Sequence, residues 1–135
     1  MGMCFMTNQQ LVKQWLIKAK SNLERAKAGK VAEEVLFEDL CFDCQQAVEK
    51  ALKAWMVHLD IVFPWTHSIA RLLECIAEKG IFLPEDVKEA VILSDYAVTT
   101  RYPGEYEAVT EEEYREALEI ACRVSAWVER QIRGE

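Results

Sequence analysis

Apolar residues recur along most of this chain at every third or fourth position, the spacing of amphipathic helices. The first such pattern covers residues 8–28. Thr7 or Asn8 can cap its start, and Gly29 ends it. The second covers residues 33–59, roughly 27 residues, and as one helix would span about 40 Å. The sequence therefore predicts two long helices in its first half.

Proline and glycine divide the next part of the chain into shorter elements. Pro64 interrupts the helical pattern, and Thr66 is a suitable N-cap for a third helix over residues 67–79. Gly80 follows as a helix terminator. We therefore predict a helix of moderate length here, with His67 as its first residue.

Two further helices are predicted in the last part of the chain. Pro84 suits the first turn of a fourth helix over residues 84–101, which must stop before Pro103. Thr110 and Glu113 have the spacing of a capping box, which opens a fifth helix ending near Arg133. No segment alternates like a half-buried strand, and GIFLP is too short to build a sheet. The pattern predicts an all-α bundle of four main helices plus a shorter one.

Composition narrows the class of protein. The 135 residues fit one domain, with residues 1–7 expected to form a flexible N-terminus, and 51% of them are apolar. The net charge of −7 gives no general attraction to nucleic acid, so such a role requires a local basic patch or a partner. No apolar run is long enough to cross a membrane, and MGMCFMTNQQ lacks the features of a signal peptide. We expect a cytoplasmic protein.

The sequence offers little for a metal or cofactor. Five cysteines form no disulfide framework, and the pair Cys41 and Cys44 falls inside a helical pattern on its apolar side. We interpret them as buried apolar residues rather than a metal or redox pair. Only His58 and His67 are present, and phosphate-loop, H-E-x-x-H and G-x-S-x-G motifs are missing. We expect no metal and no cofactor.

Two positions in the middle of the chain carry candidate chemistry. His67, at a helix N-terminus, is placed to bind a phosphate or move a proton, or is simply a half-exposed residue of the capping region. Lys50 and Lys53 lie opposite the apolar stripe of the second helix, which predicts a solvated face with Gln46 and Glu49 spaced to pair with them. Gln45 lies at the stripe's edge, where a half-buried amide needs partners.

The segment TTRYPGEYEAVTEEEY gathers an arginine and three tyrosines around a Pro-Gly pair. Arg101, Tyr102 and Tyr106 suit phosphate contact and base stacking. Alternatively, Tyr102, Tyr106 and Tyr114 close the end of the bundle, and Arg101 complements a helix dipole. Residue types alone leave both interpretations open.

Three segments, FEDLCFDCQQAVEKALKAWM, WTHSIARLLECI and LSDYAVTTRYPGEY, resemble the HEPN domain family (higher eukaryotes and prokaryotes nucleotide-binding) in order and spacing. The resemblance covers about residues 11–132. It implies an up-and-down antiparallel bundle, usually a homodimer. Members of this size are often encoded beside a minimal nucleotidyltransferase, in pairs described as toxin–antitoxin or two-component modules. Many HEPN proteins are metal-independent RNases, whose signature is an arginine followed four to six residues later by a histidine.

This chain departs from the RNase signature. Arg101 takes the position of the motif arginine, but no histidine follows it, and Tyr106 stands at the four-residue spacing. A tyrosine of ordinary pKa is a poor general base near pH 7. His67 matches a histidine that small HEPN domains often carry at the start of this helix.

The resemblance implies a non-catalytic or weakly catalytic protein that binds nucleotide or nucleic-acid phosphate and works with a nucleotidyltransferase partner. The residues expected to bind are Arg101, Tyr102, Tyr106, His67, Lys50 and Lys53. One alternative is an RNase toxin in which His67 or Tyr106 replaces the missing histidine, with Arg101 as the other catalytic candidate. Another is a non-catalytic dimeric adaptor.

Overall fold

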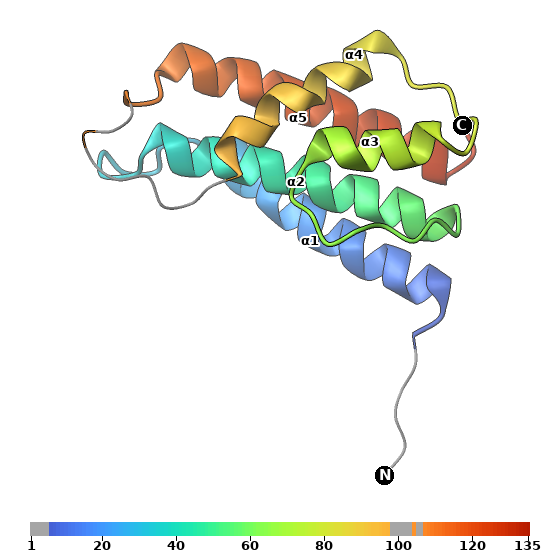
Figure 1. The fold of residues 1–135 in the computed structure, drawn as a ribbon. Coiled ribbons are helices and arrows are strands. Elements are labelled where there is room, and N and C mark those ends of the chain that lie inside the picture. The colour runs from blue at the N-terminus through green and yellow to red at the C-terminus, as the bar shows by residue number, and fades with distance from the viewer. Residues whose placement is uncertain (1–5, 98–103, 105–106) are drawn as a thin grey trace.

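In the computed structural model, which describes residues 6–97, 104 and 107–135, the chain forms helices and no strand (Figure 1). The three long helices are α1 (Asn8–Ala28), α2 (Phe37–His58) and α5 (Glu111–Ile132). A nine-residue helix, α3 (Ile69–Ala77), lies on α2, and the short α4 (Glu85–Lys88) continues into a 3-10 helix, η1 (Glu89–Tyr96). The predicted all-α bundle is confirmed.

The two helices with the clearest capping signals begin where the sequence predicts. The Thr7 hydroxyl accepts a hydrogen bond from the Gln10 amide, and the Gln10 side chain accepts one from the Thr7 amide. Thr110 and Glu113 form the same reciprocal pair at the start of α5. These boxes satisfy backbone N–H groups that no earlier turn can pair. At the other end of α1, Gly29 adopts a φ of 70°, as expected of a helix terminator.

The central helix, α2, is buried on nearly every side. It starts at Phe37 rather than near residue 33, because residues 31–36 form bends and turns between α1 and α2. α1, which runs antiparallel to it, packs along one side, while α5, α3 and η1 cover the others (Figure 1). Polar side chains are buried with the apolar ones, so the helix has no fully solvated face.

The third helix starts later than predicted because a different hydroxyl caps it. The Ser68 Oγ accepts from the Arg71 amide at 3.2 Å, which makes Ser68 the N-cap of α3. The Thr66 Oγ instead accepts from the Ser68 amide at 3.0 Å within the preceding loop. Thr66 was therefore the wrong N-cap, and His67 precedes the helix instead of beginning it. The helix also ends at Ala77, before the predicted residue 79.

The fourth predicted helix changes type along its length. Pro84 is its N-cap, with extended backbone, rather than its first helical residue. After one turn of α-helix the chain tightens into η1, which packs against α2, α3 and α5. η1 ends at Tyr96, so the helix stops before its predicted end at Arg101, a residue that lies outside the described ones.

Tyr114 closes one end of the bundle. Its ring stacks on Phe37 with centroids 5.4 Å apart, and its hydroxyl donates to the Ala26 carbonyl, which belongs to the last turn of α1. The Ala26 carbonyl also accepts from the Gly29 amide at 3.3 Å, so the tyrosine hydroxyl adds a second donor at the end of α1. The interpretation of Tyr114 as a residue that closes the bundle is confirmed. Tyr102 and Tyr106 lie outside the described residues.

The two cysteines of the C-x-x-C pair are part of the core. Cys41 and Cys44 have no exposed surface, which confirms their interpretation as buried apolar residues. Burial, reinforced by the neighbouring Cys41, strongly raises the pKa of the Cys44 thiol. Cys44 therefore stays protonated at neutral pH.

Candidate functional site

His67 is held in place by a buried carboxylate. Its Nδ1 lies 3.0 Å from Oε1 of Glu49, and the His67 carbonyl accepts from the Gln45 side-chain amide at 3.1 Å. Glu49 is 3% exposed, whereas the imidazole is 72% exposed. Two residues inside α2 therefore fix His67 just before α3: Glu49 holds its solvent-exposed side chain, and Gln45 holds its backbone.

The same carboxylate pairs with Lys53, one turn later on α2. The Lys53 Nζ lies 2.9 Å from Oε2 of Glu49 and 5.5 Å from the ring centroids of both Trp15 and Phe63. The two rings meet edge to face at 5.9 Å. Aromatic faces attract a desolvated ammonium, so Lys53 is positioned by charge and by cation–π contacts together.

The environment of Glu49 determines its charge. Burial alone would raise the pKa of this carboxyl, but hydrogen bonds from Lys53, Gln45 and His67 and the charge of Lys53 together lower it below its ordinary value. Glu49 is therefore ionised and can only accept hydrogen bonds. The His67 Nδ1 must carry a proton to donate, which leaves Nε2 as the reactive nitrogen. In the described part of the chain, no group pairs with Nε2.

Lys50 belongs to a second network, on the side of α2 that faces α1. Its Nζ donates to the Asn22 side chain at 2.7 Å, and Asn22 donates to Asp43 at 2.9 Å. Arg25 lies 3.5 Å from the other oxygen of Asp43. Burial and the nearby Lys18 lower the pKa of Lys50, although Glu49 and Asp43 act in the opposite direction.

The predicted solvated face of α2 is wrong. Lys53 and Glu49 are buried, Lys50 and Gln46 are half-buried, and of the two expected pairs only Glu49 with Lys53 forms. Gln46 donates to the Gln45 side chain instead. The expectation that Gln45 needs partners is confirmed, since it is fully buried and fully engaged.

The structure brings some of the predicted site residues together, and it does not describe the positions of others. His67 and Lys53 share Glu49, which the sequence marked only as a pairing partner for lysine. The spacing Gln45, Glu49, Lys53 places three polar side chains on one line of the helix, and this was the available signal. Arg101, Tyr102 and Tyr106 lie outside the described residues, so their roles stay predictions.

The described part of the chain offers no cluster typical of a metal centre. Within residues 6–97, 104 and 107–135, no three His, Cys, Asp or Glu side chains gather so that they could hold an ion. None of the helices in these ranges is long and apolar enough to cross a membrane.

Comparison with known proteins decides the family. A family model of the HEPN domain matches residues 12–131, which include the whole His67–Glu49–Lys53 site. This chain belongs to the HEPN domain family. Among curated proteins, no match is found.

Two solved structures are similar to this chain in fold. ST0689, described as an archaeal HEPN homologue, is 30% identical, with a TM-score of 0.71, over 90% of this chain and 97% of its own. TT1696 from Thermus thermophilus is 34% identical, with a TM-score of 0.71, over 88% of this chain and 96% of its own. The likeness therefore extends over nearly the full length of each of these chains.

Proposed function

We propose that this HEPN protein binds a nucleotide or a nucleic-acid end through its phosphate, with His67 as the contacting residue. The observation that carries this is the fixed, exposed imidazole of His67, whose Nδ1 is bound by the buried Glu49. A side chain held by a charged partner loses little conformational freedom when it binds a ligand.

The surroundings of His67 favour an anion. His67 directly precedes the N-cap of α3, and the N-terminus of a nine-residue helix carries partial positive charge and N–H groups without a preceding turn. A protonated imidazole can donate from Nε2 to a phosphate oxygen while Nδ1 stays on Glu49. Arg101, Tyr102 and Tyr106 complete the proposed site, Arg101 for a second phosphate contact and the tyrosines for base stacking.

Exposed apolar residues beside His67 support the partner part of the proposal. In the loop before α3, Trp65 is fully exposed and Val62 is 94% exposed. Large apolar side chains in this position commonly mark a protein interface. The proposed assembly is a homodimer that works with a minimal nucleotidyltransferase. The partner is tested by co-purification with that enzyme, which Trp65→Ser should weaken. Light scattering that gives a monomer would contradict the dimer.

Binding is tested by calorimetric titration of the full chain with ATP and with a 5′-phosphorylated RNA oligonucleotide. His67→Ala and Arg101→Ala should each weaken binding about tenfold or more, the effect of losing a hydrogen bond to a charged group. His58→Ala is the matched control, because His58 is the other histidine and is also exposed. If neither ligand gives heat, or if His67→Ala binds as well as the unmodified chain, the proposal fails.

The Glu49–His67 pair also favours a second candidate, a metal-independent RNase. A carboxylate that holds Nδ1 of an imidazole leaves Nε2 ready to accept a proton, as in carboxylate–histidine pairs of hydrolases. This candidate requires RNA cleavage in the presence of a chelator, with loss of cleavage in His67→Ala and in Arg101→Ala. Intact RNA at high protein concentration would leave phosphate binding as the function.

A further inference from the structure

The charges on α1 are unlike those of the chain as a whole. This helix carries five cationic side chains and one carboxylate, although the net charge of the chain is −7. A local excess of positive charge is what an acidic protein needs in order to attract a polyanion. The strength of that attraction depends on how many of these cations are already neutralised by neighbouring carboxylates.

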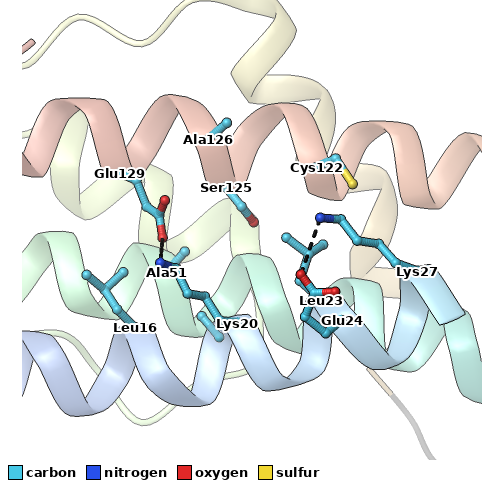
Figure 2. A pocket seen from close by; sticks show the side chains of 11 residues that line it. Leu16, Lys20, Leu23, Glu24, Lys27, Ala51, Cys122, Ser125, Ala126 and Glu129 are labelled. Carbon is cyan, nitrogen blue, oxygen red and sulfur yellow. Dashed lines mark hydrogen bonds and ion pairs between the residues drawn. The ribbon is translucent and has the colours of Figure 1, made fainter.

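On the side of α1 that faces α5, the cations are neutralised. Lys20 forms an ion pair of 3.4 Å with Glu129 of α5, and Lys27 pairs with Glu24 at the same distance (Figure 2). Two ammonium groups and two carboxylates leave no net charge on this side. The hollow of about 300 Å³ between the two helices therefore has little attraction for an anion.

Another face of α1 borders α2. Its members follow one another at intervals of three or four residues, the spacing of one helix face, and are Trp15, Lys18, Asn22 and Arg25. The Lys53 ammonium of α2 lies 5.5 Å from the centroid of the Trp15 ring, and Asn22 accepts from Lys50 of α2 at 2.7 Å. Lys18, between these two contacts, therefore stands over the seam between α1 and α2.

Three cations meet along this seam, and we call them the cation strip: Lys18, Arg25 and Lys50. Within the described part of the chain, one carboxylate is paired with the strip, that of the buried Asp43, which lies 3.5 Å from Arg25. The Lys50 ammonium has three N–H donors, of which Asn22 takes one. Three cations against one carboxylate leave the strip with an excess of positive charge.

The cations of the strip also act on one another. Burial and the charge of Lys18 lower the pKa of the Lys50 ammonium, even though two carboxylates act in the opposite direction. Like charges that are held close together repel each other, and an anion placed among them reduces this repulsion. The arrangement therefore favours a ligand that carries negative charge.

The strip is elongated and begins beside the proposed phosphate site. Lys18 and Arg25 stand two turns apart, about 10 Å along α1. Lys50 directly follows Glu49 in α2, and Glu49 holds His67. A ligand with charge along its length therefore contacts more of these groups than a compact anion does.

We propose that the cation strip binds the backbone of a nucleic-acid strand whose terminal phosphate lies at His67. Lys18, Lys50 and Arg25 contact phosphodiester groups beyond that end, and such contacts position a strand without reading its sequence. The choice of a nucleic acid rests on the proposed function of the His67 site, whereas the charge excess of the strip does not depend on it.

The test compares ATP with a 5′-phosphorylated single-stranded RNA, each titrated into the full chain at a series of salt concentrations. Lys18→Gln should weaken RNA binding about two- to fivefold and leave ATP binding unchanged. The slope of log K against log salt concentration for RNA should become shallower by about 0.7, the value of one lost phosphate contact. Lys18→Arg, which keeps the charge, should restore the slope. Lys18 is exposed, so neither change disturbs the core.

Lys50→Gln should make the RNA slope shallower by a similar amount, because glutamine can still donate to Asn22 but carries no charge. Lys13→Gln is the matched control, since Lys13 is also an exposed lysine of α1 but lies on another face of the helix. This control should keep the RNA slope of the unmodified chain.

Two results separate this proposal from the proposed function. If His67→Ala binds both ligands as well as the unmodified chain, the phosphate site at His67 fails, while a shallower RNA slope in Lys18→Gln still supports the strip. The strip is overturned if Lys18→Gln and Lys13→Gln give the same RNA slope, or if Lys18→Gln weakens ATP as much as RNA. Equally tight binding of polyglutamate with the same charge would also overturn it and would indicate an acidic protein as the partner.

Discussion

Replacing Glu49 with glutamine keeps the shape of the side chain but removes the charge that three donors share. Oε2 accepts from Lys53 at 2.9 Å, while Oε1 accepts from Gln45 and His67 at 3.0 Å. A glutamine offers one acceptor oxygen, so its NH₂ group must face at least one of these donors. The change therefore leaves the buried ammonium of Lys53 without a counter-charge.

The expected loss of stability is large. Breaking a buried ion pair by removing one partner costs about 3–5 kcal/mol. The acceptor oxygen that glutamine keeps offsets part of this cost, so we expect a loss of about 3 kcal/mol. Both side chains are at least nine-tenths buried, so solvent screens the interaction little. For a domain of this length, a loss of about 3 kcal/mol lowers the thermal midpoint by about 10 °C.

The pH dependence follows from the lowered pKa of Glu49. A carboxyl whose pKa is depressed in the folded state contributes stability above its unfolded value, about 4.3, and loses it as the pH falls through the folded value. The difference in unfolding free energy between the unmodified chain and Glu49→Gln should have its largest value at pH 7 and become smaller below about pH 4. Urea denaturation at a series of pH values measures this difference.

Glu74→Gln is the matched control for this experiment. Glu74 pairs with Arg71 at 3.6 Å, but both side chains are about half exposed or more, so the pair is worth at most about 1 kcal/mol. Equal midpoints for the two variants at pH 7 would refute the reasoning. A difference that stays constant from pH 7 to pH 3 would show that the charge of Glu49 is not its cause.

Three smaller changes test other contacts of the fold. Asp43→Asn should cost about 1–3 kcal/mol in urea denaturation, because the buried carboxylate accepts from Asn22; an unchanged midpoint would contradict the network. Tyr114→Phe should cost about 1 kcal/mol without changing the m-value, since only the bond to the Ala26 carbonyl is lost. Gly29→Ala should lower the thermal midpoint by a few degrees, because a residue with a Cβ at a positive φ costs about 1–2 kcal/mol. An unchanged midpoint would contradict the positive φ at the end of α1.

Features decided by neighbouring residues could be predicted from the sequence. The capping box of Thr110 and Glu113 was predicted from their spacing, and Thr7 was one of two caps considered for the first helix; both helices begin where expected. The start of α3 was harder, because Thr66 and Ser68 both offer a hydroxyl, and the loop uses one for a turn and the other for the cap. No proline or glycine marks the change from α4 to η1, so the sequence carried no signal for it.

The candidate site could be predicted only in part. His67 was recognised from its predicted position at the start of a helix, but its partner Glu49 lies 18 residues earlier. A helical projection assigns charged residues to solvent, and this fails for a helix surrounded by four other elements. On such a helix, buried polar side chains form hydrogen bonds and ion pairs with one another, as Lys53 and Glu49 do. The sequence does not show which of these pairs form.

The burial of α2 has a consequence for genetic screens of this protein. Gln45, Glu49 and Lys53 share the interior with core residues such as Leu52, so damage at these positions removes folded protein from the cell as well as any activity. Inactive clones would therefore accumulate along α2 whatever the protein does. His67, whose side chain stands in solvent, can be replaced without that loss of abundance. A scan that records protein level beside phenotype would separate the two classes of position.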